Sequence, residues 1–308
     1  MRRVLVLAAL ILAGVLSQGA MWFGCSETPP EKTATIQKLR DNLYVIIGGG
    51  GNTAVLVTDA GVVLVDTKLP GWGPVILQKI KMVTDKPVTT IINTHTHGDH
   101  VGSNAFFRTA VDIVAHENTK AHMQIQLDFF ESDRSGFVPN TTFADTMSLM
   151  SGTDRIDLYY FGAGHTNGDA VVVFPAARTA HAGDLFAGKG PPIIDAVHGG
   201  SGIAFPETLS KMYRDIHDVD TIITGHSTLM TWTDLKDYAA FNQDFLDWTV
   251  AQMQAGRSAD DAGAAYKRPD KYQDYVVEPW QVKTNVERIY NELKKPATPP
   301  FRWRGGVG

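Results

Sequence analysis

The segment 94–100, Thr-His-Thr-His-Gly-Asp-His, constrains this chain more than any other feature of its sequence. Four side chains that can bind a metal fall within six residues, directly after an apolar run over 88–92 that predicts a buried strand. In an extended backbone, side chains two residues apart point the same way, so His95 and His97 can bind one metal. Polar clusters of this kind are rarely buried without a ligand, so the segment predicts a metal site.

The second half of the segment indicates a second binding point. Gly98 permits a turn, and that turn directs Asp99 and His100 away from the first pair of histidines. Imidazole and carboxylate ligands together suit zinc, and they also suit iron or manganese.

Composition places the chain among soluble globular proteins. It has 308 residues, of which 44% are hydrophobic and 20% charged, so it can form one large domain or two small ones. The formal net charge is -5 and the sequence contains no block of Lys and Arg. We therefore expect a small-molecule substrate and no nucleic acid as partner, and nothing in the sequence indicates a protein partner.

The N-terminus predicts export. Arg2 and Arg3 precede an apolar run over 4–16, which is too short for a membrane-spanning helix and is typical of a signal peptide. The only cysteine, Cys25, follows Gly24, where a bacterial lipoprotein would carry its lipid anchor. We expect residues 1–25 to be a signal peptide or a lipoprotein signal. The mature protein is then periplasmic, or attached to the bacterial envelope through lipidated Cys25 or an uncleaved N-terminal segment.

The pattern of apolar segments predicts two runs of strands with helices outside them, and therefore a sheet-on-sheet core. An antiparallel meander is expected first, and the predicted strands are 36–39, 43–47, 54–57, 62–65, 88–92, 111–115, 156–161, 170–174, 179–182 and 221–224. The predicted helices are 70–83, 103–108, 117–130, 206–216, 234–254 and 283–294. The region 131–150 is expected to be a loop. We divide the chain into a domain over 34–255 and an extension over 256–308, in which 283–294 shows the only clear helical pattern.

Three further segments place a metal-binding side chain at or just after the end of a predicted strand. They are Gly-Ala-Gly-His-Thr with His165, His-Ala-Gly-Asp-Leu with Asp184, and Gly-His-Ser with His226. A glycine beside each side chain lets the backbone turn sharply or approach closely. Taken with the first segment, seven candidate ligands recur where a rigid scaffold presents functional loops.

The order HxHxDH, GHTxGD, GD and GH resembles the metallo-β-lactamase-fold superfamily, from about residue 35 to about residue 226 and beyond. The resemblance implies an α/β fold, a four-layer αββα sandwich with its site at one sheet edge, here followed by a helical C-terminal extension. It implies a first metal held by His95, His97 and His165, a second held by Asp99, His100 and His226, and a bridge formed by Asp184. Asp66 stands where the family has a supporting carboxylate behind the ligands.

The remaining candidates are weaker. His198 and Lys189 follow Asp184 in a region where family members contact substrate, and the ammonium of Lys189 could neutralise a substrate carboxylate. The glycines 48–51 fit either a mobile flap over the site or a plain hairpin turn. Four other histidines match no ligand position and are expected to be structural or exposed: His116, His122, His181 and His217.

The implied activity is that of a dinuclear zinc-dependent hydrolase. Two divalent metals about 3.5–4 Å apart share a water and lower its pKa towards about 7, and the resulting metal-bound hydroxide attacks an ester, thioester or lactam carbonyl. Asp99 is the candidate catalytic residue, because it can orient the nucleophile while it binds metal. Two Zn²⁺ ions are the expected cofactors, with Fe or Mn as alternatives.

Several alternatives stay open. Asp184 at the bridging position resembles glyoxalase II-like hydrolases, whereas typical metallo-β-lactamases carry Cys or Ser there; a β-lactamase proper remains an alternative. Mononuclear-iron persulfide dioxygenases share much of the first motif, although the complete second ligand set argues against them. Flavodiiron proteins carry HxExD, in which His97 replaces the Glu, and a nuclease would need a basic surface. A non-catalytic metal-binding envelope protein is the last alternative, because fold does not determine function.

Overall fold

The computed structural model describes residues 32–107, 111–127 and 137–294. The predicted signal segment over 1–25, with Cys25, lies outside these residues. Residue contacts separate Met1–Lys32 from Thr33–Gly308, and the description below concerns the second of these units. Among the described helices, none combines the length and the apolar character that crossing a bilayer requires.

Seven strands form the first sheet, and their spatial order follows the sequence. Antiparallel pairing joins the first four strands, so the predicted meander is confirmed, and parallel pairing joins the last four. The strands are β1 (Thr35–Lys38), β2 (Leu43–Ile47), β3 (Thr53–Val57), β4 (Val62–Val65), β5 (Val88–Ile92), β6 (Asp112–His116) and β7 (Thr141–Phe143).

Six strands form the second sheet, in the order β13-β12-β11-β10-β9-β8. Only the β11 and β12 pair is parallel among these described strands. The strands are β8 (Thr146–Leu149), β9 (Ile156–Tyr159), β10 (Val171–Phe174), β11 (Thr179–Gly183), β12 (Thr221–Thr224) and β13 (Met230–Thr231).

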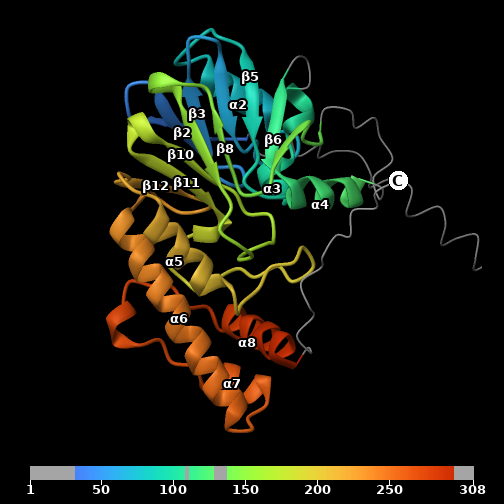
Figure 1. Ribbon diagram of the computed structural model, residues 1–308, viewed down its shortest axis with the longest axis vertical. Helices are drawn as coiled ribbons and strands as arrows, with labels where there is room; N and C mark the ends of the chain where they lie inside the picture. Colours follow the sequence, from blue (N-terminus) through green and yellow to red (C-terminus); the bar gives the residue numbers. More distant parts are fainter. Residues whose placement is uncertain (1–31, 108–110, 128–136, 295–308) are drawn as a thin grey trace, which may run out of the picture. The chain divides into compact units, whose positions relative to one another are not determined.

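Apolar side chains on both faces of each sheet produce a four-layer αββα sandwich, which confirms the predicted fold class (Figure 1). Between the sheets, Val65 and Ile92 belong to the same buried cluster as Leu158 and Val172. The outer face of the first sheet packs on α2 (Gly73–Ile80), and the outer face of the second packs on α5 (Phe205–Asp215) and α6 (Trp232–Gln254). Burial of apolar surface at about 25 cal/mol per Å² drives this layering.

The C-terminal extension is helical, as predicted. It contains α7 (Ala259–Ala265) and α8 (Pro279–Lys294), which pack together and against α6 (Figure 1). Phe245 of α6 lies in one buried cluster with Val286 and Ile289 of α8. Two other helices follow strands of the first sheet in the sequence: α3 (Gly98–Val101) comes after β5, and α4 (Glu117–Leu127) comes after β6.

Three local features differ from what the sequence pattern indicates. The region 131–150 contains β7, which pairs with the distant β6, and β8, which forms a local hairpin with β9. These strands have only three and four residues, so their apolar pattern is too short to stand out from the polar residues around it. The extension contains α7 besides α8. The sequence pattern does not indicate α7, because the segment Ala-Asp-Asp-Ala-Gly-Ala-Ala buries only Ala262 and shows no apolar periodicity. The expected helix over 103–108 is a 3₁₀ turn, Asn104–Phe107, and residue 108 lies outside the described residues.

Candidate metal centre

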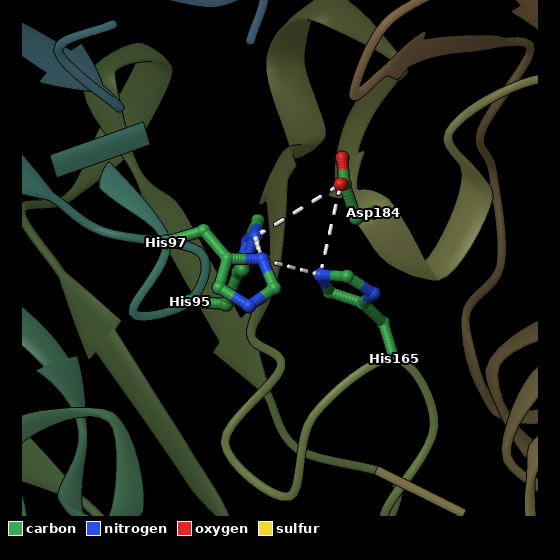
Figure 2. Close-up of side chains that lie close together, drawn as sticks. All are labelled: His95, His97, His165 and Asp184. Atoms are coloured by element: carbon green, nitrogen blue, oxygen red, sulfur yellow. Dashed lines mark hydrogen bonds and ion pairs between the residues drawn. The ribbon is translucent and has the colours of Figure 1, made fainter. Parts of the chain in front are cut away.

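Loops that follow four strands bring all seven predicted ligands to one place. The loop after β5 carries four of them, and one more lies beyond each of β9, β11 and β12. The side chains form two groups that could hold a metal, and Figure 2 shows the first, which includes Asp184. The members are His95, His97, His165 and Asp184 in one group, and Asp99, His100 and His226 in the other.

The first group is a buried triangle of imidazoles. Nδ1 of His97 lies 3.2 Å from Nε2 of His95 and 2.9 Å from Nε2 of His165. The three rings meet edge to face, with centroids between 4.6 and 4.8 Å apart. His95 and His165 are fully buried, whereas the side chain of His97 is 25% exposed.

Hydrogen bonds on the far side of His95 decide which ring nitrogen carries its proton. The Thr94 hydroxyl donates to Asp66 Oδ2 at 2.7 Å, so its oxygen accepts from Nδ1 of His95 at 3.0 Å. The proton of a neutral His95 is therefore on Nδ1, and Nε2 presents a lone pair to the other two imidazoles.

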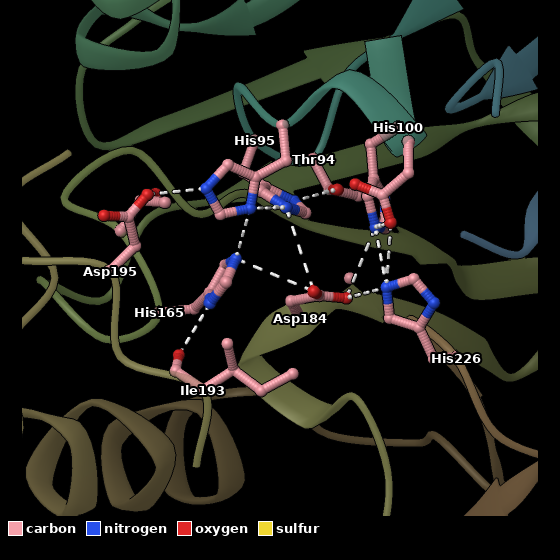
Figure 3. A network of polar contacts seen from close by, with 12 residues as sticks. Thr94, His95, His100, His165, Asp184, Ile193, Asp195 and His226 are labelled. Carbon is pink, nitrogen blue, oxygen red and sulfur yellow. Dashed lines mark hydrogen bonds and ion pairs between the residues drawn. The ribbon is translucent and has the colours of Figure 1, made fainter. Parts of the chain in front are cut away.

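The same argument holds for the other two histidines (Figure 3). Nδ1 of His165 donates to the carbonyl oxygen of Ile193 at 2.6 Å, because a carbonyl can only accept. Nε2 of His97 donates to Oδ2 of Asp195 at 2.6 Å. Three lone pairs thus point at one another in a buried space, an arrangement that is unfavourable unless a cation lies between them.

The second group is built around His100. Its Nδ1 lies 2.6 Å from Oδ2 of the fully buried Asp66, and its Nε2 faces Nε2 of His226 at 3.3 Å. Asp99 Oδ2 lies 3.2 Å from Nε2 of His226 and 3.7 Å from Nε2 of His100. This donor set of two imidazoles and a carboxylate suits a divalent transition metal.

Asp184 lies between the two groups and offers one oxygen to each (Figure 3). Oδ2 lies 3.6 Å from Nε2 of His165 and 4.0 Å from Nε2 of His95. Oδ1 lies 3.3 Å from Nε2 of His100 and 3.2 Å from Nε2 of His226, yet it is buried and has no hydrogen-bonding partner. A buried carboxylate oxygen without a partner is costly, so its position fits a shared metal ligand.

Protonation differs between the two groups. Burial lowers the pKa of His165 to about 4, so its imidazole is neutral. The carboxylates of Asp184 and Asp99, each with an oxygen 3.2 Å from Nε2 of His226, raise the pKa of His226 to about 9. Burial opposes ionisation of Asp184, but His100 and His226 hold its pKa well below the ordinary value, so it is a carboxylate.

The backbone comes unusually close to both groups. A Cβ on Gly225 would lie 1.9 Å from Oδ1 of Asp184, and a Cβ on Gly51 would lie 2.3 Å from the His100 ring. Gly51 ends the glycine run that connects β2 to β3, and its carbonyl accepts from the buried ammonium of Lys68 at 2.8 Å. These positions therefore require glycine for lack of space beside the metal-binding side chains.

The two weaker candidates lie near the centre. His198 Nδ1 shares the carboxylate of Asp195 with His97, and the His97 and His198 ring centroids are 5.5 Å apart. Lys189 lies in ion pairs with Asp234 and Asp274, at 2.7 and 2.6 Å. Their roles towards a substrate stay predictions.

The four remaining histidines lie outside both groups. His181 is buried and bonded to the backbone of Asn52, His116 stacks on Tyr160, and His122 lies 2.7 Å from Asn167 Oδ1. His217 is exposed.

Asp195 is the site residue that sequence reasoning missed. It follows no motif and is eleven residues beyond Asp184, so only the folded loop shows that it meets His97. Hydrogen bonds from His97 and His198 outweigh the effect of burial and lower the pKa of Asp195 far below its ordinary value. The spacing of Asp195 and His198 was the one available signal, and it does not distinguish a surface pair from a site.

Comparison with known proteins identifies the family. The family model described as the metallo-beta-lactamase superfamily matches residues 46–226, more than half of the chain. The metallo-beta-lactamase type 2 of Elizabethkingia meningoseptica is 28% identical over 266 residues, which cover 82% of this chain and 96% of that protein. The 2,4-dinitroanisole O-demethylase subunit alpha of Nocardioides sp. (strain JS1661) is 29% identical over 160 residues, which cover 50% of this chain and 47% of that one.

Solved structures share the fold. A metallo-beta-lactamase from Pontibacter korlensis aligns with a TM-score of 0.58 and 20% identity, over 68% of this chain and 99% of that one. The sec-alkylsulfatase Pisa1 from Pseudomonas sp. aligns with a TM-score of 0.73 and 14% identity. That alignment covers 85% of this chain but only 50% of the alkylsulfatase, so the chain spans half of the length of that neighbour.

We expect the second group to lose metal before the first as pH falls. Below about pH 9 the imidazole of His226 carries a proton that a metal must displace, whereas His165, with a pKa of about 4, is already neutral. Each displaced proton lowers apparent affinity about tenfold per pH unit. For a chain with a metal in each group, the metal content should be lower after dialysis at about pH 6 than after dialysis at about pH 8, and it should approach one ion per chain. Parallel loss from both groups would contradict this.

We expect Asp195→Asn to weaken metal binding by the first group about 10–100-fold. The amide can donate to Nε2 of His97, which would move the ring proton to Nδ1, where the lone pair is needed. Competition with a chelator measures the affinity, and Asp218→Asn, at an exposed position, is the matched control. Unchanged affinity in the Asp195 variant would show that this hydrogen bond does not orient the ligand.

Proposed function

Because the chain belongs to the metallo-beta-lactamase superfamily, we propose that it is a hydrolase that binds two zinc ions and cleaves an ester, thioester or lactam bond. The single observation that carries the proposal is the position of Asp184. Its two oxygens face two separate sets of metal-binding nitrogens, and Oδ1 is buried without a hydrogen bond. One metal would leave that oxygen without a partner, whereas two metals satisfy both oxygens.

The residues fit this chemistry. When bound, two divalent ions lower the pKa of a water and polarise the carbonyl that is attacked. Burial acts to raise the pKa of Asp99, but the hydrogen bond with His226 and the charge of His100 keep it below the ordinary value. Asp99 is therefore an ionised carboxylate with a side chain 30% exposed, so it can accept a hydrogen bond from a water at the centre and orient it.

Asp66 supports the second group through His100. Its carboxylate is fully buried and accepts from the Thr94 backbone N–H at 2.8 Å as well as from Nδ1 of His100. The same side chain accepts from the Thr94 hydroxyl, which in turn accepts from His95. Asp66 thus holds one ligand of each group in the orientation that a dinuclear centre needs.

β-Lactams are a second class of candidate substrate. The relative from Elizabethkingia meningoseptica is named a metallo-beta-lactamase and covers most of this chain, although identity is only 28%. A mononuclear-iron dioxygenase would leave Asp99, His100 and His226 without a role, so it fits the geometry less well.

We also propose that the protein acts on a small molecule in the bacterial envelope after export. The proposal rests on the basic and apolar pattern of residues 1–25 alone, because these residues lie outside the described structure.

We expect the purified protein to contain about two zinc ions per chain. Asp184→Asn should reduce this to about one or fewer and lower turnover by at least about 100-fold, because it removes the shared anionic oxygens. Elemental analysis gives the stoichiometry, and a screen of esters, thioesters, a chromogenic lactam and a secondary alkyl sulfate gives the activity. Asp218→Asn is the control.

The alternatives give different results in the same assays. A single iron that Asp184→Asn leaves in place, with oxygen uptake and sulfite formation from a persulfide, would replace the hydrolase by the dioxygenase. Two bound metals without turnover of any class of substrate would favour a non-catalytic metal-binding protein.

The variant Asp99→Asn separates an effect on catalysis from an effect on metal binding by the first group. The amide keeps the shape of the side chain but removes the negative charge that orients the nucleophile. We expect kcat to fall by about 100-fold to 10,000-fold with the first metal retained. Steady-state kinetics together with metal analysis check this. A loss that appears only in KM would assign Asp99 to substrate binding instead.

A further inference from the structure

A cavity of about 340 Å³ opens beside the candidate metal centre. His226 forms part of its wall, together with the loop that follows Asp184 and a segment of the C-terminal extension. A substrate whose reacting bond lies at the metal centre would therefore extend into this cavity. Its lining includes Ala187, Pro191, Ile193, Tyr238 and Val276.

Hydrogen bonds from the C-terminal extension hold one wall of the cavity in place. The backbone N–H of Val276 donates to the carbonyl of Lys189 at 3.0 Å, and the buried Asn285 of α8 donates to the carbonyl of Pro192 at 2.6 Å. Gly190 has no space for a side chain, because a Cβ would lie 2.7 Å from the Val276 carbonyl oxygen. The wall formed by 187–193 is thus held against the extension by backbone contacts.

A second attachment holds the far end of the same loop. The carboxylate of Glu292 on α8 accepts from the Ser201 hydroxyl at 2.6 Å and from the Gly202 backbone N–H at 2.7 Å. Ile289, one helical turn earlier, lies against Gly202, where a Cβ would meet it at 2.5 Å. The loop is therefore held near its start by Val276 and at Pro192, Ser201 and Gly202 by α8.

Charge in the cavity does not favour an anion. Lys189 is the only Lys or Arg among the described lining residues, and its ammonium already pairs with Asp234 and Asp274, whereas His226, the other basic side chain of the lining, belongs to the second group of candidate metal ligands. Glu278 places a carboxylate in the lining itself, and the two carboxylates that pair with Lys189 lie behind it. A substrate carboxylate in this cavity would gain little from Lys189 and would be repelled by its neighbours.

Two of the large aliphatic side chains that line the cavity are exposed to solvent. Val276 is 65% exposed and Ile193 is 38% exposed, although both are large aliphatic side chains beside a polar centre. Exposed aliphatic side chains around a concavity are typical of a site that binds an apolar ligand.

We propose that this cavity is the subsite for an uncharged, apolar acyl or alkyl group of the substrate, and that Lys189 braces its wall and does not bind an anion. The cleavage of the attached bond rests on the proposed hydrolase function; the binding preference of the cavity does not. The substrate class is therefore that of neutral aliphatic or aryl esters and thioesters.

Matched esters test the preference. p-Nitrophenyl pentanoate and the glutarate monoester share the scissile bond and chain length, but the second ends in a carboxylate. We expect kcat/KM of the metal-loaded protein to be at least about tenfold higher for the pentanoate. Lys189→Met should affect both esters alike. A selective loss of glutarate hydrolysis in that variant, or a preference for glutarate in the parent protein, would overturn the proposal.

A steric variant locates the group in the cavity. Val276→Trp should lower kcat/KM for the pentanoate about tenfold, mainly through KM, and leave p-nitrophenyl acetate nearly unchanged, because a short acyl group does not reach the wall. Val197→Trp is the control, since Val197 is 85% exposed and does not line the cavity. Equal effects of the two variants would contradict the assignment.

Binding separates failure of this inference from failure of the hydrolase. If no ester is cleaved, the proposed function fails, but saturation-transfer NMR of the same metal-loaded protein still compares pentanamide with glutaric acid monoamide. Binding of pentanamide that Val276→Trp abolishes and Val197→Trp preserves supports the subsite. Equal binding of both amides, or no effect of Val276→Trp, rejects it.

Discussion

Three imidazole lone pairs that face one another determine most of what surrounds this centre. The ring N–H of each of these histidines, His95, His97 and His165, donates a hydrogen bond to an acceptor on the side away from the other two rings. None of the three can therefore donate to the others. Such a triangle is stable only around a cation, and the fold holds it together by burying the histidines at the ends of strands from both sheets. Metal binding and folding are therefore expected to be thermodynamically linked.

Much of this could be predicted from the sequence. The spacing of His95 and His97 after an apolar run correctly placed two imidazoles side by side, and the strand-end positions of His165, Asp184 and His226 correctly indicated convergence. These inferences succeed because they depend on local geometry and on the alternation of side chains along a strand. A sheet-on-sheet core with helices outside was predictable from the apolar patterns of most strands and helices, whereas the four-layer αββα arrangement was implied by the family resemblance.

The remainder depends on contacts between distant segments. Nothing near Asp195 in the sequence reveals that it accepts from His97, a residue 98 positions earlier. Likewise β7 forms by pairing with β6, although α4 lies between them in the sequence, and the role of α8 emerges only from Asn285 and Glu292 meeting the loop after Asp184. Long-range pairing of this kind leaves no periodic trace in the chain, so single-sequence reasoning cannot find it.

The loop over 187–202 connects the orientation of the first-group ligands with the shape of the cavity. It supplies the carbonyl of Ile193 to His165 and the carboxylate of Asp195 to His97, so its position determines which nitrogens face the metal. The same loop forms one wall of the cavity beside His226, and the C-terminal extension holds it at Lys189, at Pro192 and at Gly202. A shift of this loop would change the orientation of the first-group ligands and the shape of the cavity together. The described part of the C-terminal extension thus supports the candidate metal centre through this loop, because it fixes the backbone from which the orienting groups project.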